Sequence, residues 1–130
     1  MIRWYTTVVK ARDHRAQAAW WARALGWQVF FSGDDEAVVI PPWAQELVGA
    51  TPFERVPPGL VFVPVPEPKT GPNRLHLDLA PSQDSDHEAE VERLVELGAR
   101  RVDVGQGDVP WVVLADPEGN EFCVLTPRAY

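Results

Sequence analysis

The clearest hydrophobic pattern lies in the second half of the chain. Apolar and polar residues alternate strictly in Arg74-Leu75-His76-Leu77-Asp78-Leu79. A period of two is typical of a strand with one buried face. The three leucines are therefore expected on one side of this strand, and His76 and Asp78 on the other.

A helix is predicted after this strand. Ser85 and Glu88 have the spacing of a capping box, in which the serine caps the helix and the glutamate reaches back. Gly98 is suited to the left-handed conformation that ends many helices. The apolar stripe of this helix consists of Val91, Leu94 and Val95.

Three short strands are expected to follow the helix. They cover residues 101–104, 111–115 and 122–126. The last two are joined by Asp116-Pro117-Glu118-Gly119-Asn120, which places Pro and Gly where a turn needs them.

The first half shows the same order of elements. A β-branched strand over residues 3–9 precedes a helix that Asp13 can cap and Gly26 can end. The helix carries an apolar stripe at positions i, i+3, i+4 and i+7. The stripe is Ala18, Trp21, Ala22 and Leu25, and the strands expected after the helix are 28–31, 37–40 and 60–63.

Proline separates the two halves. Nine of the 13 prolines fall between Pro41 and Pro72. Proline has no N–H for a strand ladder, so this segment is expected to be mostly loop, with short edge strands at most. The order βαβββ thus occurs twice, and it predicts two copies of one module, at about 1–66 and 73–130.

Composition and charge narrow the function classes. The chain has 130 residues, 45% of them hydrophobic, which is enough for one domain with a real core. Its net charge of −7 and pI near 4.8 disfavour nucleic acid and anionic membrane surfaces as partners. A neutral or cationic small molecule suits this charge better. The single cysteine and the absence of a leader-like N-terminus lead us to expect a cytoplasmic protein.

Four stretches resemble the vicinal oxygen chelate superfamily, in its glyoxalase-like and bleomycin-resistance-like branch. They are Ala18-x-Trp20-Trp21-x-x-x-Leu25-Gly26, Asn73-Arg74-Leu75-His76-Leu77-Asp78-Leu79, Leu97-Gly98-Ala99 and Asp116-Pro117-Glu118-Gly119-Asn120-Glu121-Phe122-Cys123-Val124. The resemblance implies an α+β fold in which two tandem βαβββ modules form a curved, mixed-sheet half-barrel cleft within one domain, 1–130. It also implies a homodimer.

The resemblance places metal ligands on the first and last strand of each module. His76 matches one of these positions, and Cys123 stands where the family usually has a glutamate. The first module offers only Tyr5 or Thr6 and Val61 or Val63. The full metal site is thus missing, a glyoxalase I activity is disfavoured, and no cofactor is predicted. A divalent metal held by His76 and Cys123, joined by Asp78 or Glu121, is the open alternative.

Two functions remain open. In the first, the protein binds a small aromatic or cationic molecule without catalysis. In the second, it is an enzyme acting on a small oxygenated metabolite, with His76 as acid/base or metal ligand and Glu121 or Asp78 as the partner carboxylate. Ordinary packing or hydrogen-bonding roles explain each of these side chains as an alternative. The ligand-binding candidates are Trp43, His76, Asp78, Trp111 and Cys123.

Overall fold

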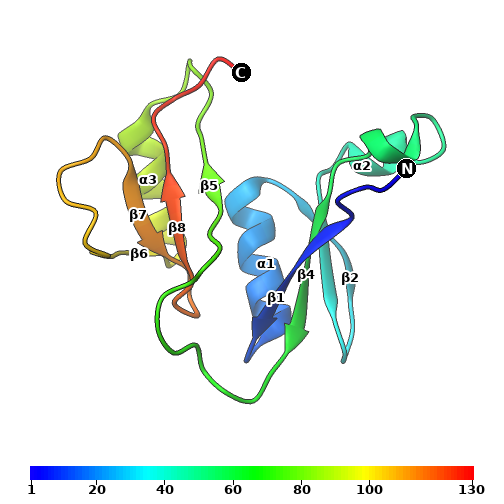
Figure 1. The fold of residues 1–130 in the computed structure, drawn as a ribbon, viewed down its shortest axis with the longest axis horizontal. Coiled ribbons are helices and arrows are strands. Elements are labelled where there is room, and N and C mark those ends of the chain that lie inside the picture. The colour runs from blue at the N-terminus through cyan, green and yellow to red at the C-terminus, as the bar shows by residue number, and fades with distance from the viewer. The chain divides into compact units, whose positions relative to one another are not determined.

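The computed structural model describes all residues, 1–130. The chain divides into two compact units, Met1–Pro68 and Lys69–Tyr130. Each unit contains a long helix and a four-stranded mixed sheet, and neither sheet is closed (Figure 1). The α+β fold with tandem βαβββ modules is therefore confirmed.

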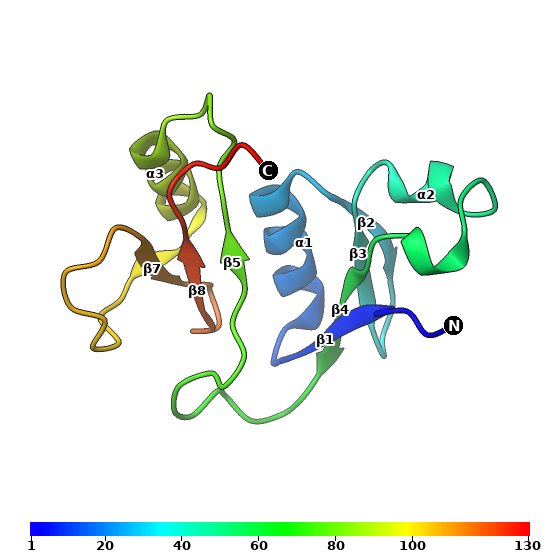
Figure 2. The same cartoon turned by 45° about the horizontal axis from the view of Figure 1, so that its top comes forward.

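The first unit has four strands, one long helix and two short helical turns. Its sheet has the order β1-β4-β3-β2, with β1 parallel to β4 and the other pairs antiparallel. The short turns α2 and η1 lie in the segment between β3 and β4 (Figure 2). The elements are β1 Thr6–Ala11, α1 His14–Leu25, β2 Gln28–Ser32, β3 Ala37–Ile40, α2 Ala44–Leu47, η1 Phe53–Arg55 and β4 Gly59–Pro64.

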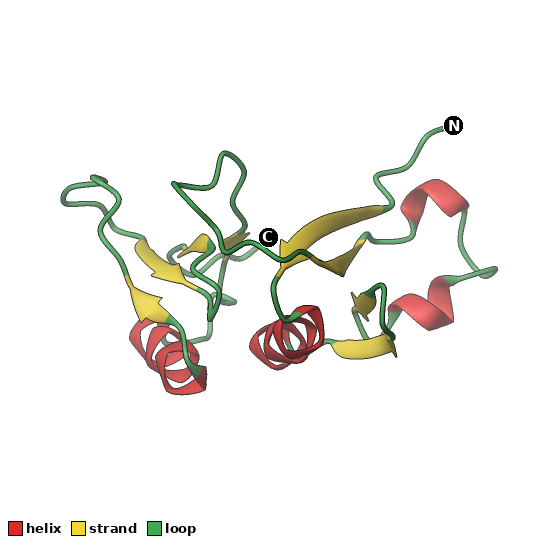
Figure 3. Ribbon diagram, turned by 90° about the horizontal axis from the view of Figure 1, so that it is seen from below, coloured by secondary structure: helices red, strands yellow, loops and turns green.

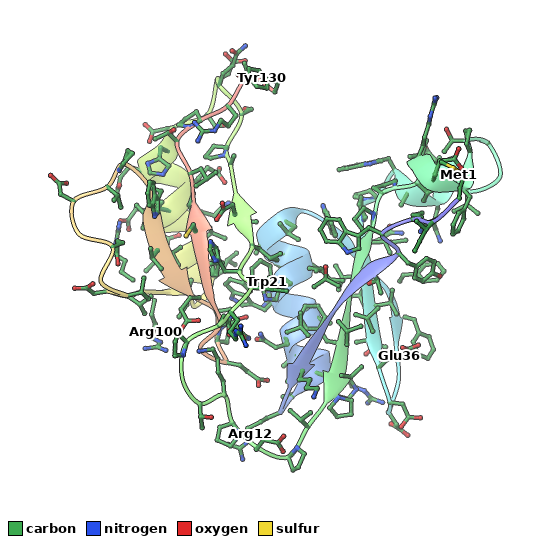
Figure 4. All side chains as sticks on the ribbon, viewed as in Figure 1. Met1, Arg12, Trp21, Glu36, Arg100 and Tyr130 are labelled. Carbon is green, nitrogen blue, oxygen red and sulfur yellow. The ribbon has the colours of Figure 1, made fainter.

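Helix α1 lies against one face of the first sheet (Figure 3). Both predicted caps are confirmed: the Asp13 side chain accepts from the Ala16 N–H, and Gly26 is left-handed. The buried surface is wider than the predicted stripe. Trp21, labelled in Figure 4, is buried as expected, but so are Gln17, Trp20 and Ala24.

Strand β4 corrects the expectation of edge strands in the proline-rich segment. It is an inner strand, paired with β1 on one side and β3 on the other. The prolines allow this because Pro57 and Pro58 precede the strand and Pro64 is its last residue, so Gly59–Val63 keep every N–H. Phe62 at its centre is fully buried.

The second unit has a sheet of order β5-β8-β7-β6, with β5 parallel to β8. Helix α3 lies on one face of it (Figures 1 and 3). Arg101 of β6 forms ion pairs with Glu88 and Glu92 of α3, which tie the helix to the sheet. The elements are β5 Asp78–Leu79, α3 His87–Leu97, β6 Arg100–Arg101, β7 Val112–Ala115 and β8 Glu121–Val124.

Strand β5 is shorter than its sequence pattern predicts. Only Asp78 and Leu79 pair with β8, opposite Cys123 and Val124. Extending this register would place residues 74 and 75 beside the Asp116–Asn120 turn, where there is no strand to pair with. Leu75 is accordingly 89% exposed, and its predicted place in the core is wrong.

The start of α3 also differs from the prediction. Asp86 is the N-cap, and its carboxylate accepts from the Ala89 N–H at 2.9 Å. The Ser85 hydroxyl instead hydrogen-bonds the Ser82 hydroxyl. The predicted end at Gly98 is confirmed.

Alternation along β7 and β8 defines two faces of the second sheet. Leu114, Phe122 and Val124 point toward α3 and are buried. We call the other side the distal face; its residues include Asp78, Val113, Ala115, Glu121 and Cys123.

No helix of the protein has the length and apolar character that a membrane span requires.

Candidate functional site

The distal face gathers His76, Asp78 and Cys123. The parallel pairing of β5 and β8 sets Asp78 directly opposite Cys123, so their side chains share a face. His76 precedes Asp78 by two residues, and its Nε2 lies 3.1 Å from Asp78 Oδ1. One ligand atom from each of the three residues lies within 4.8 Å of the others. These three side chains therefore meet within a single unit.

Exposure differs within this cluster. The side chains of His76 and Asp78 are each 50% exposed, whereas Cys123 is buried at 8%. Burial raises the pKa of the Cys123 thiol, and the charge and hydrogen bond of Asp78 raise it further. The thiol is therefore protonated at neutral pH and is a poor nucleophile on its own.

Glu121 is next to this cluster on the distal face and has its own partners. Its Oε1 accepts from Lys69 Nζ and its Oε2 from the Asn73 N–H, each at 2.9 Å. Burial opposes ionisation of Glu121, but these two donors outweigh it and lower the pKa of the carboxyl. Both oxygens are thus engaged in holding residues 69–73 against β8, which favours a structural role over that of a base.

We expect Glu121→Gln to reduce the free energy of unfolding by about 1–2 kcal/mol at neutral pH, because it removes one partner of a largely buried ion pair. Because the pKa of this carboxyl is lowered by folding, the ionised carboxylate stabilises the protein at pH values above the pKa of the unfolded chain. This stabilisation is lost as the pH falls through the pKa of the folded protein. The difference between the two proteins should shrink in acid. Urea unfolding at several pH values measures it; a difference that persists unchanged in acid would contradict the assignment.

Neither contact of Glu121 was predicted from the sequence. Lys69 and Asn73 lie 52 and 48 residues from it along the chain, and nothing in their local pattern indicates a partner.

The two units differ in net charge. The second unit holds twelve of the acidic residues and six of the basic ones, so it carries almost all of the net negative charge.

The two candidate tryptophans belong to different units. Trp111 immediately precedes β7 in the second unit and is 38% exposed. Trp43 is the N-cap residue of α2 in the first unit and is 54% exposed. Trp111 lies two residues before Val113, in the bend ahead of β7 and outside its paired residues. Contact of Trp43 with a ligand stays a prediction.

A family model described as a glyoxalase-like domain matches residues 6–125. The chain belongs to this glyoxalase-like family, within the vicinal oxygen chelate superfamily. The match covers both βαβββ modules and agrees with the resemblance read from the sequence. No curated protein sequence matches the chain significantly.

Solved structures share the glyoxalase-like fold at low sequence identity. An enzyme of the glyoxalase/bleomycin resistance protein/dioxygenase family from Burkholderia phytofirmans PsJN is 13% identical, with 98% of this chain and 100% of that chain covered and a TM-score of 0.70. The fosfomycin resistance protein FosX from Mesorhizobium loti is 12% identical over 98% and 94%, at 0.65. A bleomycin resistance determinant encoded on transposon Tn5 is 15% identical over 98% and 99%, at 0.53. These likenesses show the fold alone, since one fold carries many functions.

The metal-ligand positions expected from the glyoxalase-like resemblance fall on or beside strands of both units. In the first unit, Val61 lies between Val8 and Val38 in the sheet register and offers no donor atom. Thr6 uses its hydroxyl to donate to the Gly59 carbonyl. In the second unit, Asp78 adds a third group beside His76 and Cys123.

Proposed function

We propose that this glyoxalase-like protein binds a small aromatic or cationic molecule on the distal face of its second sheet. The observation that carries the proposal is the half-exposed Asp78 carboxylate. Its partners are His76, which is charged only when protonated, and the neutral Cys123 thiol. Asp78 thus offers a carboxylate that no arginine or lysine neutralises.

The surroundings of Asp78 favour a positively charged or polarisable ligand. The neighbouring Glu121 is already paired with Lys69, so Asp78 is the acid on this face that a ligand could use. The excess of acidic residues in the second unit attracts cations. The exposed indole of Trp111 adds a surface on which an aromatic or cationic group can stack.

Asp78→Asn and Trp111→Ala are each expected to weaken binding of an aromatic cation about tenfold. The first removes the charge that pairs with the ligand, and the second removes a stacking contact worth roughly 0.5–2 kcal/mol. The affinities are measured by quenching of tryptophan fluorescence. The protein is titrated, in the presence of a chelator, with a panel of planar aromatic amines and quaternary ammonium compounds. For Trp111→Ala, calorimetry replaces fluorescence.

Asp84→Asn is the matched control, because it removes one negative charge from an exposed position of the same unit, in the loop between β5 and α3. Equal losses in Asp78→Asn and Asp84→Asn would show that only net charge matters and would overturn the proposed role of Asp78. Absence of binding by every compound of the panel would overturn the proposed ligand class.

The contact between His76 and Asp78 supports a second candidate function. A carboxylate 3.1 Å from the ring nitrogen orients an imidazole, as a general acid/base requires. Such an enzyme would act on a small oxygenated metabolite. His76→Ala separates the two candidates: turnover would be abolished in the enzyme, whereas ligand affinity would change little in the binding protein.

A further inference from the structure

The N-terminal segment of the first unit holds an arginine whose charge is not paired. Residues 1–5 precede β1 and lie beside the helical turn η1 (Figures 1 and 2). The Arg3 Nη1 donates to the Phe53 carbonyl of η1 at 3.3 Å. Arg3 takes part in no ion pair, and its Nε is buried without a hydrogen-bond partner. Buried donors are nearly always satisfied in folded proteins, so this one indicates that a further group binds here.

Two aromatic rings hold the Arg3 guanidinium in place. Its central carbon lies over the Tyr5 ring, 4.8 Å from the centroid, and over the Phe53 ring, 4.6 Å from the centroid. Such contacts orient the plane of an arginine and leave its charge in place. Because the side chain is already ordered, an anion that binds to it loses less affinity to conformational entropy.

The exposure of these rings gives a ligand access to the guanidinium. The Tyr5 and Phe53 side chains are each more than half exposed, as is that of the neighbouring Trp4. Exposed side chains change rotamer rapidly, and such a rotation breaks no strand pairing, because residues 1–5 and η1 lie outside the sheet. The buried Nε can therefore be uncovered by a local movement.

The chemistry of this group of side chains selects the ligand. The planar fork of a guanidinium matches a carboxylate, which accepts from two of its N–H groups at once. The exposed rings of Tyr5 and Phe53 offer apolar surface next to that fork. A ring attached to the carboxylate can stack on this surface, which favours an aromatic acid over a bare inorganic anion.

The charge of the first unit permits an anion to approach. This unit holds seven acidic and six basic residues, so it is nearly neutral, and the acidic excess lies in the second unit. Glu54 is the acid nearest to Phe53 in the sequence, and it forms no ion pair with Arg3. The net charge of the whole chain therefore does not exclude an anionic ligand here.

We propose that Arg3, Tyr5 and Phe53 form a binding site for a small aromatic carboxylate on the first unit. The carboxylate accepts hydrogen bonds from the guanidinium, and the ring of the ligand stacks against the exposed aromatic side chains. The site goes beyond the proposed function, which concerns a ligand on the second unit and involves none of these three residues.

Binding is measured by calorimetry on the full chain, with benzoate as the probe. The unaltered protein should bind one benzoate per chain. Benzamide has the ring without the charge and acetate has the carboxylate without the ring, so each should bind at least about tenfold more weakly. Absence of saturable benzoate binding, or an affinity for either analogue equal to that for benzoate, would overturn the proposal.

Arg3→Gln removes the charge and the fork and should lower the affinity for benzoate at least about tenfold. Arg23→Gln is the matched control, because Arg23 is an exposed arginine on α1 of the same unit, and it should bind benzoate like the unaltered protein. Equal losses in the two variants would show that only the charge of the unit matters and would overturn the site.

Arg3→Lys keeps the charge and the contact with the rings, so it preserves the fold even if Arg3→Gln does not. It lacks the fork and should bind benzoate about threefold more weakly than the unaltered protein. Unchanged affinity in Arg3→Lys would refute the paired contact with the carboxylate. Aromatic cations are tested on Asp78→Asn and benzoate on Arg3→Gln, so each proposal can fail independently.

Discussion

Replacing Asp116 by alanine is expected to lower the free energy of unfolding by about 3 kcal/mol. The Asp116 side chain is 1% exposed and organises the turn between β7 and β8. Its Oδ1 accepts from the Glu118 N–H at 2.9 Å and the Asn120 N–H at 3.0 Å, and both carboxylate oxygens accept from the Asn120 amide. Alanine would leave these donors without their acceptor, at about 1–3 kcal/mol for each that stays buried. Urea unfolding measures the loss.

Two variants calibrate this effect. Asp116→Asn keeps one acceptor oxygen and should lose clearly less than Asp116→Ala. Asp103→Ala removes an exposed aspartate that accepts from the Gly105 N–H, and should change stability by less than about 0.5 kcal/mol because water replaces the bond. If Asp116→Ala were as stable as Asp103→Ala, the turn would not depend on its buried carboxylate. The turn matters for the candidate site because it leads directly into β8, which carries Glu121 and Cys123.

Local signals in the sequence predicted the helices well. Asp13, Gly26 and Gly98 act within one turn of the helices they cap, so a short window contains the necessary information. The same short window contains two candidate caps at the start of α3, and this explains the wrong prediction there. Ser85 and Asp86 are adjacent and both are good caps, and the choice depends on Ser82, whose hydroxyl engages Ser85.

Strand pairing was less accessible, because it depends on partners far along the chain. The alternation of residues 74–79 indicated correctly that His76 and Asp78 share a side, and their 3.1 Å contact confirms it. The same pattern could not show that β8 is only four residues long, which leaves Leu75 without a partner. The sequence alone likewise gave no sign that Lys69 and Asn73 would occupy both oxygens of Glu121.

The candidate site illustrates how a shared fold can hold different chemistry. The glyoxalase-like family model matches both modules, yet the two sheets carry different residues on corresponding faces. In the first unit, Val8, Val61 and Val38 form an apolar row, whereas the second unit presents His76, Asp78 and Cys123. Function must therefore be argued from these side chains, because the backbone arrangement is common to both units.

Gly59→Ala is expected to destabilise the protein by about 2–3 kcal/mol, whereas Gly33→Ala should be neutral or slightly stabilising. A Cβ on Gly59 would lie 2.8 Å from the Val39 carbonyl oxygen and 3.2 Å from Ile40 Cγ2. Gly59 begins the inner strand β4, whose neighbours β1 and β3 pair on both sides, so the backbone oxygen cannot move without disturbing the sheet. Overpacking of this kind typically costs about 1–3 kcal/mol.

Gly33 is the matched comparison, because a Cβ at this position would meet atoms that can move. A Cβ there would also meet atoms at 2.8 Å, but they belong to the Phe31 ring, which is 51% exposed and can rotate away. Alanine then restricts the unfolded chain, which is worth about 0.4–1 kcal/mol in favour of the folded state. Thermal unfolding of both variants compares them directly. Equal destabilisation would mean that the Phe31 ring is held as firmly as the β3 backbone, whereas a neutral Gly59→Ala would mean that β4 can shift between its neighbours.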